Sequence, residues 1–356
     1  MSLHPVVRQF GSIWERFTNN KTVPVSAQIN LTNICFSSCQ SCQKKTWPQV
    51  EIPLNKVLSI IDELSSLGCE SILLSGGEVF SYINLATVIQ AATNKGIKVG
   101  LLTSGIIHKL FIPSDLKSIF EKVFWVKVSI DSADNKRFHE IRGINALQEV
   151  IKNIGLMREI NPNLKIRNNA TISSLNAKEF IPLMKLGKSL GIETHFYPVH
   201  THEGLLLTYD EIEDYYSTVE LIRSAYMNKS LVQIREYVES KTNFFQFGNL
   251  LKRKKPKMCF IPTSHIIIDA DGEVFYCCRT LNDNDEFSKR DLQYSIGNAL
   301  QFQINKLLSG EKAETVRQLL FCANEDACNQ CDRYNYVNEL FTSFVDIRNN
   351  NTPTFL

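Results

Sequence analysis

Three cysteines stand close together near the start of the chain, at Cys35, Cys39 and Cys42. Thiolates are soft ligands that suit iron–sulfur clusters or zinc, and three of them in one loop can surround one metal centre. Three protein ligands rather than four leave one metal position open, as in a reactive site. A zinc site that takes its fourth ligand from elsewhere in the chain is the alternative interpretation of this spacing.

A second group of thiols lies in the C-terminal third of the chain. Six of the ten cysteines stand there, namely Cys259, Cys277, Cys278, Cys322, Cys328 and Cys331. The Asp-Gly of a predicted hairpin turn lies between the first two, and a Cys-x2-Cys pair ends the group. Four such thiols suit structural zinc or a closed [4Fe–4S] cluster. The two groups therefore predict two metal sites.

Composition limits the classes of protein that the chain can be. It has 356 residues, 44% of them hydrophobic and 21% charged, with a formal net charge of +2, which is ordinary for a globular protein. The near-neutral charge gives no bulk argument for a nucleic-acid partner, and no segment has the apolar length of a signal peptide or a membrane helix. We therefore expect a cytoplasmic protein without a membrane partner, whose cysteines bind metal instead of forming disulfides.

Strand-like and helix-like segments alternate through the first 200 residues. The expected strands are 25–31, 71–75, 98–103, 123–130, 165–173 and 193–199, and the expected helices are 54–67, 85–94, 135–159 and 178–190. This alternation predicts a parallel sheet with right-handed crossovers, although periodicity does not decide between an open and a barrel-like sheet. In both cases ligands bind where strands end, which is where the first cysteine group lies.

Cys-x3-Cys-x2-Cys after the first strand of such a domain resembles the radical S-adenosylmethionine (SAM) superfamily. The resemblance implies an α/β fold with a partial (β/α)6 barrel, and a [4Fe–4S] cluster on Cys35, Cys39 and Cys42. In this family SAM chelates the fourth iron and is reductively cleaved to a 5′-deoxyadenosyl radical, which takes a hydrogen atom from the substrate. A non-catalytic metal-binding scaffold is the alternative from another class of protein.

Further motifs are similar to SAM-binding segments of the family. Gly76-Gly77-Glu78 follows the second strand and is similar to the motif that holds the SAM amino group. Ser129 and Asp131 end the fourth strand on the same side, where they suit a ribose. Arg142 suits the SAM carboxylate. Ser41 stands where many relatives have an aromatic residue against the adenine, so this chain departs from the family at that contact.

The C-terminal cysteines resemble the SPASM and twitch domains that follow radical SAM barrels. The resemblance implies a small α+β domain with one auxiliary [4Fe–4S] cluster, whose ligands are Cys259, Cys277, Cys328 and Cys331. Cys278 and Cys322 remain, and relatives suggest two uses for a spare thiol, as a replacement ligand or as a catalytic hydrogen donor to a substrate radical. An ordinary buried thiol is the alternative for each.

These interpretations divide the chain into five parts. We expect an N-terminal extension (1–24), a radical SAM core (25–200), a helical linker (201–255), a SPASM/twitch-like domain (256–345) and a tail (346–356).

The resemblance also implies a class of reaction. We expect hydrogen abstraction from a peptide, giving oxidation, crosslinking or epimerisation, with a flavodoxin or ferredoxin as electron donor. The short segment before the first strand is too small for the winged-helix module of many peptide maturases, which weakens this expectation. Dehydrogenation or epimerisation of an amino sugar or another small natural-product intermediate is the alternative.

Overall fold

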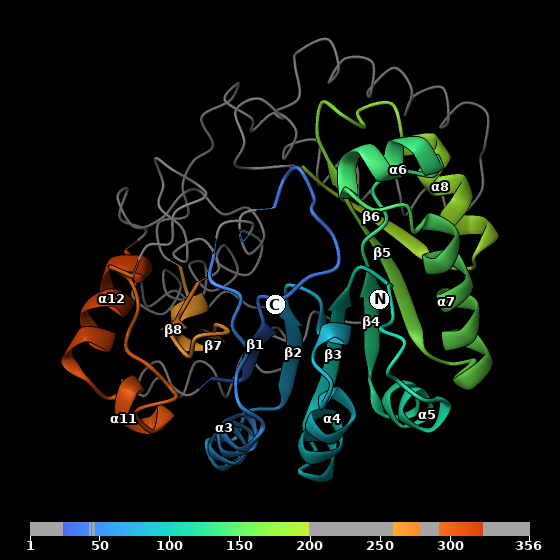
Figure 1. The fold of residues 1–356 in the computed structure, drawn as a ribbon. Helices are drawn as coiled ribbons and strands as arrows, with labels where there is room; N and C mark the ends of the chain where they lie inside the picture. Colours follow the sequence, from blue (N-terminus) through green and yellow to red (C-terminus); the bar gives the residue numbers. More distant parts are fainter. Residues whose placement is uncertain (1–23, 43, 45–46, 199–258, 278–291, 323–356) are drawn as a thin grey trace, which may run out of the picture.

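The computed structural model describes residues 24–42, 44, 47–198, 259–277 and 292–322. Its centre is one eight-stranded sheet in the order β6-β5-β4-β3-β2-β1-β7-β8 (Figure 1). The strands are β1 (Ser26–Thr32), β2 (Ser71–Gly76), β3 (Lys98–Thr103), β4 (Trp125–Val128), β5 (Lys165–Ile172), β6 (Glu193–Pro198), β7 (His265–Ile268) and β8 (Val274–Phe275).

Strands β1 to β6 are all parallel and lie in chain order, without the reversal of a doubly wound sheet. Right-handed crossovers in one direction place the connecting helices on one side, as in a barrel. The predicted partial barrel with a parallel-sheet core is therefore confirmed. No pairing between β1 and β6 closes the sheet within the described part of the chain.

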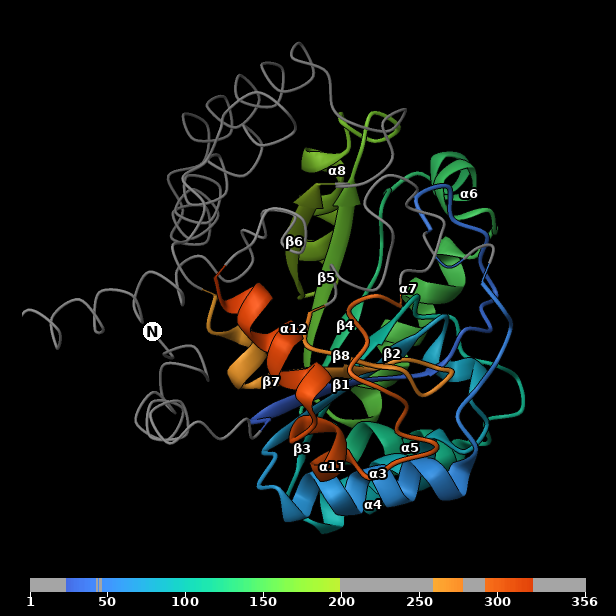
Figure 2. The ribbon, with the colours of Figure 1, turned by 90° about the vertical axis from the view of Figure 1, so that its left-hand side faces the viewer.

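The helices cover the outer side of the curved sheet (Figures 1 and 2). In the expected core, 25–200, they are α3 (Leu54–Ser66), α4 (Leu85–Asn94), α5 (Pro113–Lys122), α6 (Asn135–Arg142), α7 (Leu147–Ile160) and α8 (Phe180–Ser189), with a short 3-10 helix η1 (Val79–Ser81). The C-terminal part adds η3 (Ile261–Thr263), α11 (Ile304–Leu308) and α12 (Glu311–Phe321).

Apolar periodicity explains why these segments fold as they do. In α3 the buried side chains of Val57, Ile60, Ile61 and Leu64 form one face, as their helical spacing predicts. In β5 buried and less buried residues alternate, so that one side of the strand faces the helices and the other faces the inside of the barrel. Most of the buried apolar residues join one core that includes residues of both β1 and β7.

Two helical predictions differ from the structure. The expected helix 135–159 is two helices, because Gly143 ends α6 in a left-handed conformation and α7 begins only at Leu147. Helix α5 was not expected, although Pro113 in its first turn, Asp115 near its start and Lys122 at its end are typical helix-terminal residues. The expected linker 201–255 and tail 346–356 lie outside the described residues.

The C-terminal hairpin extends the sheet of the barrel. Strand β7 pairs in parallel with β1, and β8 pairs antiparallel with β7 (Figure 2). The predicted hairpin around Asp269–Gly272 is therefore present, and it lies at the edge of the barrel beside the strand that leads into the cysteine loop.

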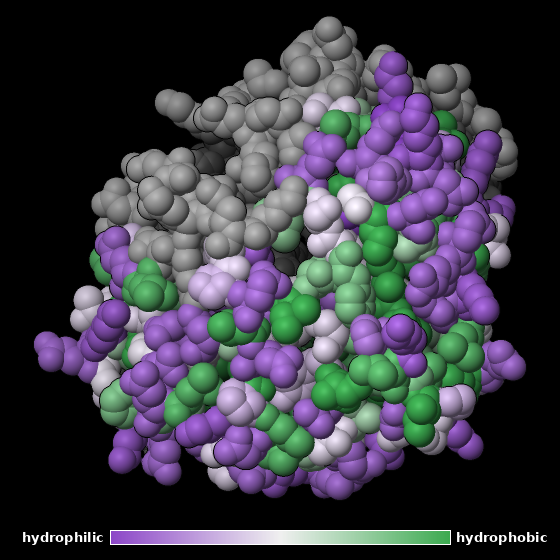
Figure 3. Space-filling model, viewed as in Figure 1, coloured by the Kyte–Doolittle hydropathy of each residue, from purple (hydrophilic) through white to green (hydrophobic). Residues whose placement is uncertain are grey.

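The described surface gives no single apolar docking site. Exposed large apolar side chains include Leu110 and Ile112 in the loop before α5, and Phe124 and Phe302 in two other segments of the chain. On the face in Figure 3, hydrophobic residues lie in several groups separated by hydrophilic ones. None of the helices in the described ranges is both long and apolar enough to cross a membrane.

Leu74 in β2 is fully buried, whereas Leu110 is 60% exposed. We predict that Leu74→Ala lowers the free energy of unfolding by about 3 kcal/mol, because it leaves a cavity in the core. The matched control Leu110→Ala should change it by less than about 0.5 kcal/mol. Urea denaturation followed by circular dichroism measures both, and equal midpoints for the two variants would contradict the assignment of Leu74 to the core.

Candidate functional site

A cavity of about 460 Å³ lies at the carboxyl ends of β1 to β4. This volume falls in the range of small-molecule sites, which is roughly 300–1,000 Å³. Seven residues predicted from the sequence line it together: Cys35, Cys39, Cys42, Gly76, Gly77, Ser129 and Arg142. The structure therefore brings the thiol loop, the glycine pair and the loop after β4 to one place.

The thiol loop is held along the end of α6 by backbone hydrogen bonds. Ser38 N donates to the carbonyl of Arg142 at 3.0 Å, and Gln40 N donates to the carbonyl of Ile141 at 3.0 Å. The Gln40 side chain adds a bond to the carbonyl of Glu140 at 2.8 Å. The last carbonyls of a helix have no partner within the helix, so the loop satisfies them and is fixed by them.

Gly143 makes this docking possible. It ends α6 with φ of 68°, a conformation that favours glycine. A Cβ atom at this position would overlap the hydroxyl of Ser38 and lie 2.9 Å from its carbonyl oxygen. Gly143 is thus required both for the backbone conformation and for the close approach of the thiol loop.

The glycine pair after β2 holds the other side of the thiol loop. Gly77 N donates to the carbonyl of Thr32 at 2.6 Å, and Glu78 N donates to the carbonyl of Ile34 at 2.9 Å. A Cβ on Gly77 would lie 2.7 Å from the carbonyl oxygen of Asn33 and overlap that of Ile34. These glycines therefore support the loop that leads into Cys35, as well as lining the cavity.

Burial keeps the thiols of Cys35 and Cys39 protonated in the free protein. It raises the pKa of Cys39 to about 11, although the positive charge of Arg142 acts in the opposite direction. Burial also raises the pKa of Cys35. Since thiolates are the metal ligands, metal binding must displace these protons.

Three thiols border the cavity together, those of Cys35, Cys39 and Cys42. Soft thiolate ligands suit an iron–sulfur cluster, and three of them leave one metal position open. The donor set at the cavity therefore fits the cluster implied by the sequence. Among the described residues, no three His, Cys, Asp or Glu side chains are grouped closely enough to hold one metal ion.

Glu78 lies behind the cavity, not on its surface. It is 1% exposed, and Thr103 Oγ1 and Ser104 N donate to its carboxylate at 2.6 Å each. The Ser104 hydroxyl and Phe80 N donate to it as well. Thr103 and Ser104 themselves line the cavity. Contact of Glu78 with the SAM amino group stays a prediction, and the geometry gives Glu78 the additional task of positioning these two residues.

Arg142 at the cavity is paired with Asp131. Its Nη1 lies 2.9 Å from Asp131 Oδ2, and both side chains are largely buried. Burial alone would lower the pKa of Arg142, but its neighbours, with the Asp131 carboxylate foremost, raise it above the usual value, so the guanidinium stays charged. Its Nε is buried and has no hydrogen-bond partner in the described ranges, which leaves a donor for a ligand.

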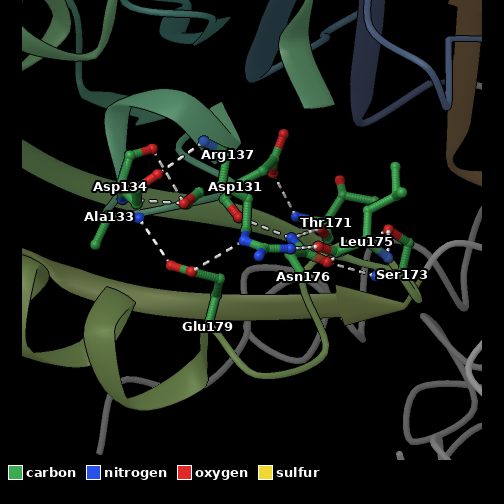
Figure 4. A network of polar contacts seen from close by, with 10 residues as sticks. Asp131, Ala133, Asp134, Arg137, Thr171, Ser173, Leu175, Asn176 and Glu179 are labelled. Atoms are coloured by element: carbon green, nitrogen blue, oxygen red, sulfur yellow. Dashed lines mark hydrogen bonds and ion pairs between the residues drawn. The ribbon is translucent and has the colours of Figure 1, made fainter. Parts of the chain in front are cut away.

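Asp131 is fixed in turn by the end of β5 and the loop that follows it (Figure 4). Thr171 N donates to Asp131 Oδ1 at 2.7 Å, and Asn176 Nδ2 donates to the carbonyl of Asp131 at 2.7 Å. Arg137 joins the same region through the carbonyl of Leu175 at 2.6 Å. Ser129 borders the cavity, whereas the Asp131 carboxylate is occupied by Arg142 and Thr171, so a ribose contact of Asp131 stays a prediction.

Sequence reasoning did not single out several residues that line the cavity. Asn33, Lys44 and Gln49 flank the cysteines, and Ser75 is the next-to-last residue of β2. Their only sequence signal is their position beside the cysteine motif or at a strand end. Phe36 stacks on His108 with ring centroids 5.5 Å apart, while Ser41 borders the cavity.

The second cysteine group is described only in part. Cys259 N donates to the carbonyl of Phe321, the residue before Cys322, at 2.8 Å, so Cys259 and Cys322 belong to neighbouring segments. Cys277 is partly buried against the main core, and Cys322 is exposed. The other three cysteines, Cys278, Cys328 and Cys331, lie outside the described residues. All roles assigned to this group stay predictions.

Comparisons with protein families match both parts of the chain. Residues 29–187 match the family model of the Radical SAM superfamily. Residues 259–332 match that of the SPASM iron-sulfur cluster-binding domain.

Curated relatives are similar over part of their length. The chain is 27% identical over 173 residues to an S-adenosylmethionine-dependent nucleotide dehydratase of Selenomonas ruminantium, covering 46% of this chain and 61% of the relative. It is 27% identical over 175 residues to a GTP 3′,8-cyclase of Synechocystis sp., covering 48% of this chain and 52% of the relative. The chain thus spans a little over half the length of these relatives.

Solved structures are similar over most of the chain. SuiB of Streptococcus suis bound to S-adenosylmethionine has a TM-score of 0.63 at 16% identity, covering 88% of this chain and 72% of SuiB. The protein anSMEcpe with bound AdoMet and Cp18Cys peptide has a TM-score of 0.58 at 13% identity, covering 92% and 100%. At these identities the likeness concerns the fold.

We predict that Gly143→Ala prevents the thiol loop from docking on α6 and removes most iron from the site of Cys35, Cys39 and Cys42. Gly191→Ala is the matched control, because Gly191 also has a positive φ of 65° but no atom within 4 Å of an added Cβ. The control should lose about 1 kcal/mol of stability and keep its iron. The iron content of both variants is measured after anaerobic reconstitution. Equal iron content in the two variants would contradict the role of Gly143 in docking the thiol loop.

Proposed function

Because the chain belongs to the radical SAM superfamily and carries a C-terminal SPASM domain, we propose that it is a peptide-modifying enzyme. Its cofactors are [4Fe–4S] clusters and SAM, which supply a radical that removes a hydrogen atom from the substrate when the cluster is reduced. The proposed outcome is oxidation, crosslinking or epimerisation of a peptide residue.

Different residues around the cavity bind the cluster and the different groups of SAM in this proposal. We propose that Cys35, Cys39 and Cys42 ligate the SAM-binding cluster. Gly76 and Gly77 give the backbone access that the SAM amino group needs, as their close packing against the thiol loop suggests. Arg142 holds the SAM carboxylate with the guanidinium that Asp131 keeps charged, and Ser129 holds the ribose.

The second cysteine group completes the proposal. Cys259, Cys277, Cys328 and Cys331 ligate one auxiliary cluster, with Cys278 and Cys322 as candidate hydrogen donors. The radical SAM core is 25–200 and the SPASM/twitch-like domain is 256–345, joined by a linker at 201–255 and flanked by 1–24 and 346–356. A flavodoxin or ferredoxin delivers the electron.

The proposal of a peptide substrate rests on a fold match that extends over both parts of the chain. The similar structures cover 88–92% of this chain, and two of these proteins, SuiB and anSMEcpe, are described with a bound peptide. The nucleotide-acting relatives cover 46–48% of it. The similarity that includes the C-terminal hairpin therefore favours a peptide.

A small anionic molecule is the second candidate substrate. The less buried side of β4 to β6 carries Lys127, Arg167 and His195, with Lys127 directly opposite Arg167 in the sheet. Burial lowers the pKa of His195, and the charge of Arg167 lowers it further. Glu193 pairs with Arg167 at 3.1 Å and lies 3.4 Å from His195, so Lys127 and the paired Arg167 are the cations that this side offers to a phosphate or carboxylate. Two relatives are named for nucleotide or GTP chemistry.

The test uses the full chain, reconstituted and reduced without oxygen, with SAM and peptides encoded beside its gene. We predict 5′-deoxyadenosine together with a peptide that loses two hydrogens or, after epimerisation in heavy water, takes up deuterium. Mass spectrometry measures both. Cys39→Ala should form neither product, and Cys69→Ala, which changes a buried core cysteine, should form both.

One outcome would contradict the peptide proposal. If every peptide is unchanged while a nucleotide or sugar phosphate is consumed, the peptide proposal is wrong. Arg167→Met should then raise the KM for that anion, as the second candidate requires.

A further inference from the structure

The segment that follows the third cysteine packs on the C-terminal hairpin. Trp47 is 5% exposed and forms a separate apolar cluster with Ile267 of β7 and Phe275 of β8. Since β7 pairs with β1, the hairpin lies beside the strand that leads into the thiol loop (Figures 1 and 2). Both ends of the thiol loop are therefore adjacent to the C-terminal part of the chain.

Lys44, which lines the cavity, forms an ion pair with the same hairpin. Its Nζ lies 2.7 Å from Oδ1 of Asp269, the residue directly after β7. Asn30 Nδ2 donates to the same oxygen at 2.8 Å, and Lys44 Nζ also donates to Asn33 Oδ1 at 3.2 Å. The ammonium group stands 5.1 Å from the ring centre of Trp47. Three partners, Asp269, Asn33 and Trp47, thus hold a lysine that is two residues from Cys42.

Because Asp269 is buried, its ion pair with Lys44 strongly constrains the position of the lysine. The Asp269 side chain is fully buried and that of Lys44 is 19% exposed. A buried carboxylate is stable only when it is paired and hydrogen-bonded, so removal of the lysine leaves a charge that water cannot reach. Lys44 also lines the cavity, so the constraint acts at the cofactor site itself.

We propose that Lys44 is a positioning residue. Its ion pair with Asp269 fixes the Cys42 end of the thiol loop, so that the cluster and SAM bind correctly only when the hairpin between Cys259 and Cys277 is in place. The C-terminal domain thereby supports the SAM site in addition to carrying its own cysteines. This inference rests on the proposed cluster ligands and does not depend on the identity of the substrate.

The experiment compares four single variants of the full chain after anaerobic reconstitution: Lys44→Met, Lys44→Arg, Asp269→Asn and Lys56→Met. Lys56 is the matched control, because its Nζ also bridges to the C-terminal part, at Leu300 O and 2.7 Å, but does not line the cavity. The readouts are iron content, the dissociation constant of SAM, and the change that SAM causes in the electron paramagnetic resonance spectrum of the dithionite-reduced cluster.

Lys44→Met and Asp269→Asn should each weaken SAM binding about ten-fold and reduce the spectral change. A fifth protein that combines Lys44→Met with Asp269→Asn should bind SAM no more weakly than either single variant, because both substitutions remove the same interaction. Lys44→Arg should restore most of the binding, and Lys56→Met should match the wild type.

Two results would overturn the proposal. One is SAM binding in Lys44→Met that equals that of Lys56→Met. The other is additive effects of Lys44→Met and Asp269→Asn, which would mean that Lys44 acts on the ligand without Asp269. If Asp269→Asn does not fold, Asn30→Ala takes its place, because Asn30 holds the same oxygen of Asp269 and does not line the cavity. No substrate is present, so failure here is distinct from failure of the peptide proposal.

Discussion

The backbone contacts of the thiol loop are the constraint on which the site depends. Between Asn33 and Val50 the described residues form neither helix nor strand, so the positions of the cysteines cannot come from regular structure. They come from hydrogen bonds to the end of α6 and to the segment after β2, at approaches that a Cβ on Gly143 or Gly77 would block. A parallel sheet brings these three chain segments together because their strands end at the same edge.

The charged side chains around the cavity are held by residues that follow strand ends. Of the residues that the structure describes, two cations line it, Arg142 and Lys44, and each is paired with a buried aspartate, Asp131 after β4 and Asp269 after β7. Each aspartate also accepts a hydrogen bond from its neighbourhood, so the cations are held in place instead of moving freely. Such preorganised positive charge suits a cavity that receives thiolates and a carboxylate, since it needs little rearrangement on binding.

The sequence predicted most strands and the convergence of the motifs, because apolar periodicity and strand-end position are local signals. It could not predict the break in 135–159, since Gly143 acts through contact with Ser38, which is distant in the chain. For the same reason the sequence could not predict the ion pair of Lys44 with Asp269. Nor could it predict the hydrogen bonds that Thr103 and Ser104 donate to the buried Glu78. Tertiary partners, not residue types, decide which polar side chain faces the cavity.

The most direct measurement is the metal content of the full chain purified and reconstituted without oxygen. Iron, sulfide and zinc are counted per chain in the wild type and in a variant with Cys35, Cys39 and Cys42 all changed to alanine. The account predicts about eight irons in the wild type and about four in the variant, since one [4Fe–4S] cluster is lost. Zinc in place of iron, or the same iron content in both proteins, would contradict it.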